Sequence, residues 1–218
     1  MPEDKNALPT RTSADYAHTI AKAALSAIPV IGGTAAEIFA LVIAPPLELR
    51  RDEWLEELYC ALKSLEERED GFKIENLSQD ERFISATLRA TQIALRTHQN
   101  EKRNALRNAL LNVVCDKTLD EETETFFLGL VEDFTLTHIE AMRLLSDKQT
   151  FPENRRIRLQ QEHVFTNVIV LDLNLRGLLI DPRPYVARNR DSSEPLITAG
   201  WLLSPLGTKF LKFISAPA

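Results

Sequence analysis

Glycine is scarce in this sequence: the 218 residues contain seven glycines, and no glycine-rich loop of the type that cradles phosphate groups is present. The GxSxG and HExxH patterns are also absent. These absences exclude the common sequence motifs for nucleotide binding, serine hydrolysis and zinc proteolysis. We therefore expect a protein without a cofactor and without enzymatic activity.

Cysteine is equally rare. Cys60 and Cys115 lie in apolar stretches without CxxC spacing, so we expect reduced core residues rather than a disulfide or a zinc pair. Residues 1–19 lack the basic start and compact apolar core of a secretory signal. We expect residues 1–13 to be flexible and the protein to be cytoplasmic, with peripheral membrane contact left open.

The charge is uneven along the chain. The net charge is −6, and residues 152–218 carry nine basic against six acidic residues, or +3, which leaves −9 for residues 1–151. This difference favours two modules. An acidic body argues against general nucleic-acid binding, because affinity for the phosphate backbone depends on Lys and Arg.

One long apolar segment, residues 23–47, carries a single charge at Glu37. Pro29, Gly32-Gly33 and Pro45-Pro46 interrupt it, so it predicts a helical hairpin at residues 20–44 rather than a membrane span. The hairpin is either a pair of core helices or a surface that contacts a membrane or a partner. The candidate contact residues are Ile28, Ile31, Ile38, Phe39 and Val42.

Apolar residues at helical spacing predict an all-α bundle over residues 14–150. The expected helices cover residues 14–28, 35–44, 47–67, 78–113 with a break near Thr97, 119–134 and 137–145. Four Ser/Thr-x-x-Glu spacings predict capping boxes that begin helices. Their first residues are Thr34, Ser78, Thr118 and Thr137.

A basic stripe is predicted on residues 96–107. Arg96, Arg103 and Arg107 recur at spacings of seven and four, which places them on one face of a continuous helix. Such a stripe binds an acidic partner or an anionic surface, or it pairs with the acids of the same chain. The acidic faces around Glu57 and Glu124 favour the intramolecular alternative.

Two histidines have acidic neighbours. His98 lies three residues before Glu101, and Glu132 and Asp133 precede His138. A metal or acid/base site would need these groups to converge from separate helices. The paired Glu-x-x-His pattern of bundle metal sites is absent, so we interpret these residues as capping and surface groups.

Residues 151–218 predict a helix that ends at Gly177, a strand, a basic hairpin, a second strand and a final helix that Ser204-Pro205 begins. The segments RGLLI and WLLSPLGTKFLKFI, within residues 166–214, resemble the closing half of winged helix-turn-helix domains. The resemblance implies a wing with Arg183, Arg188 and Arg190 as DNA contacts. Residues 164–180 have just two charges, Asp172 and Arg176, and we expect a buried helix there, which favours protein contact over DNA.

The fold expected is therefore mainly α, with a helical bundle followed by a small winged-helix-like α+β module containing a short β-hairpin. The layout also resembles bacterial abortive-infection proteins of the alpha type and related bacterial families, which implies a phage-defence context and supplies no catalytic residue. We expect a non-enzymatic defence or regulatory protein that acts through protein or membrane contact of its apolar hairpin. A DNA-binding regulator is the alternative, and self-association is open.

Overall fold

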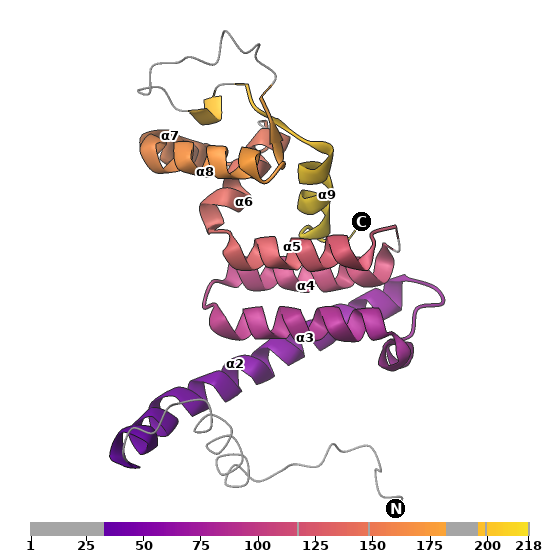
Figure 1. The fold of residues 1–218 in the computed structure, drawn as a ribbon. Helices are drawn as coiled ribbons and strands as arrows, with labels where there is room; N and C mark the ends of the chain where they lie inside the picture. Colours follow the sequence, from indigo (N-terminus) through magenta and orange to yellow (C-terminus); the bar gives the residue numbers. More distant parts are fainter. Residues whose placement is uncertain (1–32, 117, 148, 182–195, 199, 218) are drawn as a thin grey trace, which may run out of the picture. The chain divides into compact units, whose positions relative to one another are not determined.

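The computed structural model describes residues 33–116, 118–147, 149–181, 196–198 and 200–217, with the backbone alone at 33–45, 163 and 198. The described chain is mainly helical and contains a two-stranded antiparallel sheet, so the predicted mainly α class is confirmed (Figure 1). Contacts within the chain define two units, Met1–Glu56 and Glu57–Ala218. The predicted boundary between residues 150 and 151 stays a prediction.

The first described helix, α2 (Gly33–Arg68), is 36 residues long and runs through Pro45 and Pro46. The predicted bend into a separate helix at these prolines is therefore wrong. A proline removes one backbone hydrogen bond and disturbs the preceding turn. Both effects are local, and the hydrogen bonds on either side keep the long helix continuous. Helical spacing correctly predicts its apolar face, which includes the buried residues Trp54, Leu58 and Leu65.

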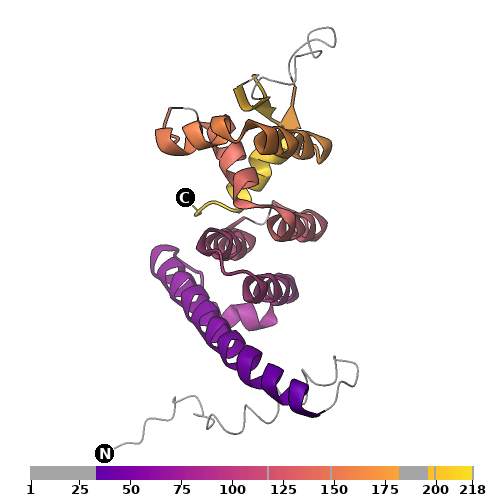
Figure 2. The same ribbon diagram turned by 90° about the vertical axis from the view of Figure 1, so that its left-hand side faces the viewer.

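Three helices of the second unit, α3 (Glu81–Arg96), α4 (Asn100–Cys115) and α5 (Glu121–Asp133), pack side by side (Figures 1 and 2). A 3-10 turn, η1 (Ile74–Gln79), precedes them. The predicted break near Thr97 is confirmed, since Thr97 ends α3. The buried residues of α3 are those that the periodicity predicts, namely Phe83, Ala86, Ala90, Ile93 and Ala94. On α4 the predicted Leu106, Leu110 and Val113 are buried, and so are Ala105, Ala109, Leu111 and Asn112.

The helix caps differ from the predicted capping boxes. Asp80 caps α3 by accepting the Phe83 N–H, and Asp120 caps α5 by accepting the Thr123 N–H, so the boxes at Ser78 and Thr118 are wrong. A carboxylate is a stronger acceptor than a hydroxyl and also interacts favourably with the helix dipole. Two aspartates therefore fill positions that the spacing rule assigned to neighbouring hydroxyl residues.

The chain then forms a second helical layer and the small sheet. Its elements are α6 (Leu136–Ser146), α7 (Glu153–Gln161), α8 (His163–Leu175), β1 (Leu179–Ile180), η3 (Leu196–Thr198), β2 (Leu202–Leu203) and α9 (Pro205–Phe213). In the antiparallel pair, Leu179 lies opposite Leu203 and Ile180 opposite Leu202. The predicted order of helix, strand, strand and helix is present in these residues.

A glycine ends α8 as the sequence predicts. Gly177 has φ +76°, a conformation that glycine adopts without steric strain. The Leu178 N–H donates to the Leu173 carbonyl at 2.9 Å, and the Gly177 N–H donates to the Asn174 carbonyl at the same distance. These two bonds form the Schellman motif that turns the chain from α8 into β1.

Ser204 joins the start of α9 to the end of α8. Its Oγ accepts the Gly207 N–H at 2.9 Å, which is the predicted N-cap with Pro205 in the first turn. The same hydroxyl donates to the Gly177 carbonyl at 2.6 Å. One side chain thus fixes two helix termini against each other.

Aromatic packing attaches α9 to α5. Phe127 lies with its ring centroid 5.4 Å from that of Phe210 and 5.5 Å from that of Phe213, and Phe134 contacts Phe210 edge-on at 5.7 Å. All four rings are almost completely buried. Asn112 of α4 is buried too, and its amide donates to the carbonyl of Phe213 at 2.8 Å. The C-terminal helix is therefore part of the core of this unit.

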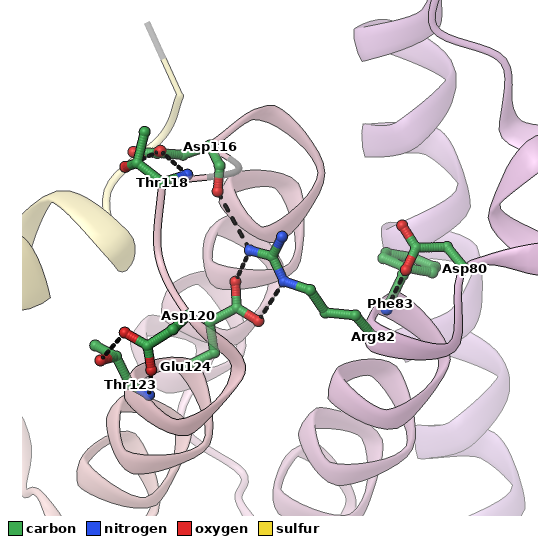
Figure 3. A network of polar contacts seen from close by, with 8 residues as sticks. All are labelled: Asp80, Arg82, Phe83, Asp116, Thr118, Asp120, Thr123 and Glu124. Carbon is green, nitrogen blue, oxygen red and sulfur yellow. Dashed lines mark hydrogen bonds and ion pairs between the residues drawn. The ribbon is translucent and has the colours of Figure 1, made fainter.

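A partly buried ion pair ties α3 to α5 (Figure 3). Arg82 binds both carboxylate oxygens of Glu124, with Nε donating to Oε2 at 2.8 Å and Nη2 donating to Oε1. The Glu124 side chain is 3% exposed. Arg82 Nη2 also donates to the carbonyl of Asp116, just beyond the end of α4. One guanidinium therefore bridges the ends of three helix segments.

We predict that Arg82→Met destabilises the protein by about 3–5 kcal/mol, because it leaves the Glu124 carboxylate buried without its partner. The double variant Arg82→Met/Glu124→Leu should recover most of that loss, since no uncompensated charge remains. Urea denaturation measures both effects. Arg96→Met is the control: it removes an exposed pair with Glu132, which is worth less than about 1 kcal/mol. Equal losses in the single and double variants would contradict the prediction.

A second prediction concerns glycine in α9. A Cβ atom at Gly207 would lie 2.1 Å from the Leu178 carbonyl oxygen, so Gly207→Ala must displace backbone and should destabilise the protein by about 1–3 kcal/mol. At Gly129 in α5, a Cβ atom meets only the end of the Arg89 side chain, at 3.1 Å. Gly129→Ala should therefore be neutral or stabilising by up to about 1 kcal/mol. Thermal denaturation of both variants tests this contrast, and similar melting temperatures would refute it.

Candidate functional site

His138 is buried at the start of α6, where it forms part of the helix cap. Its Nδ1 accepts the Thr135 N–H at 3.1 Å and lies 2.9 Å from Thr135 Oγ1. Its Nε2 lies 3.2 Å from Asp172 Oδ2 on α8. Because Nδ1 accepts a backbone N–H, the ring proton belongs on Nε2, which donates it to Asp172. The predicted capping box at Thr137 is wrong, since Thr135 and His138 take its place.

An arginine completes this cluster. Arg176 Nε donates to Asp172 Oδ2 at 3.0 Å, and Arg176 Nη1 donates to Asp133 Oδ2 at 3.0 Å. The Phe134 ring stacks on His138 with centroids 4.5 Å apart, and the Arg176 guanidinium carbon lies 5.3 Å from the centre of the Phe134 ring. This cluster of Asp133, Phe134, His138, Asp172 and Arg176 connects the end of α5 to α6 and α8.

The electrostatics of the cluster favour a neutral imidazole. Burial lowers the pKa of His138, while the bond to Asp172 opposes that shift and the charge of Arg176 adds to it. The bond to Asp133 raises the pKa of Arg176. With Nδ1 occupied by a backbone donor and Nε2 donating to a carboxylate, His138 has no nitrogen ready to accept a substrate proton. The ring holds helices together.

The acidic residues that precede His138 form ion pairs with arginines, so they are not available as metal ligands. Glu132 pairs with Arg96 at 3.0 Å, and Asp133 pairs with Arg176. His98 is exposed in the turn between α3 and α4, as is Glu101 in the first turn of α4. Within the described ranges, no three His, Cys, Asp or Glu side chains lie close enough to share a metal ion.

The basic residues do not form one helical stripe. Arg96 ends α3, whereas Arg103 and Arg107 belong to α4, so a spacing of seven does not place Arg96 on their face. Arg103 Nη2 donates to Glu57 Oε1 at 2.6 Å, and Arg96 pairs with Glu132. The pairing with Glu57 is one that the intramolecular interpretation predicted. Arg107 is half-buried on α4.

The outer face of α8 is apolar and exposed. Four of its side chains are largely exposed to solvent: Val164 (70% exposed), Val168 (57%), Leu171 (48%) and Leu175 (84%). At 100° per residue, these four side chains fall within an arc of about 60° on the helix. We call these four residues the α8 stripe. Phe165, 47% exposed, lies beside it.

The opposite face of α8 is buried. Ile169, Val170 and Leu173 are at most 3% exposed, and α8 packs against α6, α7, β1 and η3. The expectation that the whole helix is buried is therefore wrong for the stripe. A helix that is apolar around its circumference is typical of a buried element, and composition alone does not reveal that one side has no cover among the described residues.

Several predicted contact residues lie outside the segments that the structure describes. Ile28, Ile31 and the wing residues Arg183, Arg188 and Arg190 lie in segments that the structure does not describe. Ile38, Phe39 and Val42 belong to α2, with the backbone alone described. In the part of the chain that is described, no helix combines the length and hydropathy needed to cross a membrane.

A hollow of about 730 Å³ lies beside the ends of α2, α4 and α9, and no sequence pattern indicated it. Its walls include Phe72, Asn112, Cys115, Asp116 and Lys212. Hydrogen bonds from Thr118 and the Lys212 ammonium hold the pKa of Asp116 well below its usual range, so that carboxylate is ionised and paired. Partial desolvation raises the pKa of Cys115, which keeps the thiol protonated near neutral pH.

Both cysteines differ from their predicted place in the core. Cys60 and Cys115 are free, as expected, but exposed. Cys60 lies on the side of α2 opposite the buried Leu58 and Leu62, and Cys115 is the last residue of α4. A thiol kept protonated beside a paired carboxylate does not make the hollow a reactive centre.

We predict that protonation of His138 weakens the fold as pH falls. Because the folded-state pKa of His138 lies below its ordinary value, the unfolded chain binds this proton more readily. The contribution is complete above about pH 6.5 and is lost as pH falls through the folded-state pKa. Urea denaturation between about pH 7.5 and pH 5.5 should show a steeper loss of stability for the wild type than for His138→Asn, which keeps an acceptor but does not titrate. Parallel curves would contradict this role.

Comparison with protein-family models, curated proteins and solved structures found no match to this chain. The surfaces and side-chain clusters described above are therefore the basis for assigning a function. Of these, His138, Arg96 and Arg103 bind groups of the chain itself, whereas the α8 stripe presents apolar side chains to solvent.

Proposed function

We propose that this chain is a non-enzymatic regulatory protein that acts by binding another protein through the α8 stripe. The observation that carries the proposal is the exposure of four apolar side chains in line along one helix. Single exposed apolar residues are ordinary on protein surfaces, but a contiguous apolar patch marks an interaction site. An apolar helix face is also the surface that a second helix or an apolar groove recognises.

The charges around the stripe support a protein rather than a nucleic acid as the partner. Asp172 and Arg176 flank its C-terminal end, and they bond to each other at 3.0 Å. The four stripe residues themselves carry no hydrogen-bond donor on their side chains. A helix that binds a DNA groove needs several donors directed at phosphates and base edges. The stripe therefore fits an apolar protein surface better.

A winged-helix arrangement of the C-terminal elements is part of the proposal. The order α8, β1, β2, α9 supports it, together with the resemblance of residues 166–214 to such domains. In that arrangement α8 would occupy the position of the DNA-recognition helix, with an apolar face in place of a basic one. DNA binding through Arg183, Arg188 and Arg190 is the alternative function, and salt-dependent affinity for duplex DNA would favour it.

The resemblance to abortive-infection proteins suggests bacterial defence as the context, and contact of the apolar hairpin with a membrane or partner stays a prediction. The roles of His138, Asp116 and Cys115 support a non-enzymatic protein: the imidazole is engaged at both nitrogens, the carboxylate is paired and the thiol is protonated. A binding role does not require any of these groups to react.

We predict that Leu171→Lys removes protein binding without unfolding the chain. Leu171 is about half exposed at the centre of the stripe, so a lysine there costs little stability but places a charge in the contact. Chemical cross-linking in cells that express the full chain should yield a cross-linked product for the wild type and at most about a tenth of it for the variant.

Leu88→Lys is the matched control, because Leu88 is an exposed leucine on another helix, α3. It should retain the product, and both variants should keep the wild-type melting temperature by circular dichroism. If Leu171→Lys cross-links as well as Leu88→Lys does, the α8 stripe is not the contact surface and the proposal fails.

A further inference from the structure

We infer that the α8 stripe binds the same stripe of a second copy of this chain, with the two helices antiparallel. The inference rests on the proposed function and identifies its partner. The pattern of residues along α8, their sizes and the charges beside them support it. Each is a property of the stripe as the structure describes it.

The spacing of the stripe suits a helix pair. Val164, Val168, Leu171 and Leu175 follow one another at intervals of four, three and four residues, which is the spacing of a and d positions in a coiled coil. Such residues form the narrow seam along which two helices pack. The amphipathic stripe of a helix that docks on a globular core is broader.

The stripe is also symmetric about its midpoint, which lies between Ile169 and Val170. A two-fold axis through that point would place Val164 against the partner's Leu175 and Val168 against the partner's Leu171. Every contact then pairs a shorter side chain with a longer one, so the spacing between the helices stays even. A parallel pair would face valine with valine at one end and leucine with leucine at the other, and the helices would splay. Antiparallel helix dipoles also favour this arrangement.

The flanking charges do not oppose it. Asp172 is paired with Arg176 and accepts a hydrogen bond from the neutral His138 ring, and Arg176 also pairs with Asp133. Both charged side chains beside the C-terminal end of the stripe are therefore already ion-paired within their own chain. A partner rich in acidic or basic groups would find no free counter-charge on these four side chains, whereas a neutral apolar face matches them.

The size of the stripe predicts a weak, reversible dimer. The exposed fractions of the stripe and Phe165 correspond to an apolar area on the order of 500 Å² per chain, taking about 150 Å² or slightly more for each large side chain. A standard stable interface buries about 800 Å² per partner. We therefore expect association in the micromolar range, dependent on protein concentration.

Analytical ultracentrifugation of the full chain across the micromolar range tests association. The wild type and Leu88→Lys should dimerise, and Leu171→Lys should raise the dissociation constant at least about tenfold, since each dimer loses two buried leucines. Val168→Glu should have a similar effect. The double variant Val168→Glu/Leu171→Lys should regain part of the affinity, because the antiparallel register places each glutamate against the partner's Lys at the substituted position. In a parallel pair the like charges would meet and no affinity would return.

Cross-linking tests the register independently. In a background with Cys60→Ser and Cys115→Ser, chains carrying Val164→Cys are mixed with chains carrying Leu175→Cys and treated with a short bismaleimide. The mixture should cross-link, and neither variant should cross-link alone, because identical positions lie roughly 16 Å apart along antiparallel helices. Cross-linking of either variant alone, in place of the mixture, would overturn the antiparallel register.

The experiments separate this inference from the proposed function. A wild type that stays monomeric, while Leu171→Lys still loses a cross-linked protein of different mass in cells, overturns self-association and leaves protein binding in place. If the wild type is monomeric and Leu171→Lys leaves the cellular cross-links unchanged, both self-association and protein binding through the stripe are overturned. That outcome would also be expected if another segment of this chain covers the stripe.

Discussion

The partly buried pair of Arg82 and Glu124 is the constraint on which the arrangement of the second unit depends. Burying two charges is unfavourable unless their geometry is good and their remaining hydrogen-bonding groups are satisfied. Here the guanidinium binds both carboxylate oxygens and also the Asp116 carbonyl, so α3 and α5 are fixed together beside the end of α4 (Figure 3). A rotation of α5 would break both bonds to Glu124 at once. The pair therefore sets which face of α5 points inward.

The consequences of that orientation extend to α8. The inward face of α5 carries Phe127, which packs on Phe210 and Phe213 and so positions α9. The N-cap of α9 is Ser204, whose hydroxyl donates to the Gly177 carbonyl at the end of α8. The cluster around His138 and Asp172 holds α8 from its other side. The orientation of α8, and with it the exposure of the stripe, follows from packing in the three-helix layer.

Local sequence patterns predicted the structural features that depend on residues close together in the chain. Helical periodicity identified the buried residues of α3 and part of those of α4. Gly177 and Ser204 were correctly assigned to helix ends because their roles there depend on neighbours within four residues. The choice among nearby caps was not predictable in this way, since Asp80 and Asp120 compete with Ser78 and Thr118 at almost the same positions. The role of His138 depends on Asp172, 34 residues away, so no local spacing could show it.

The α8 stripe shows why composition could not separate burial from binding. A side chain that stays exposed in the folded state gains almost none of the free energy that burial provides, so Leu175 at 84% exposure contributes little to folding. Polar residues at these four positions would serve the fold equally well and would keep the surface more soluble. Stability therefore does not account for the valines and leucines of the stripe.

A binding role accounts for them, because apolar area that is exposed in the free chain becomes favourable once a partner covers it. A membrane-surface helix would be expected to carry Lys and Arg along the sides of its apolar face. On α8 the described flanks carry Asn167, Asn174, Asp172 and Phe165 instead, and the cation at its end, Arg176, is paired with Asp172 and Asp133. A neutral seam with uncharged or ion-paired flanks matches the surface of another protein, and its own symmetry makes a second copy of this chain the partner that fits it most completely.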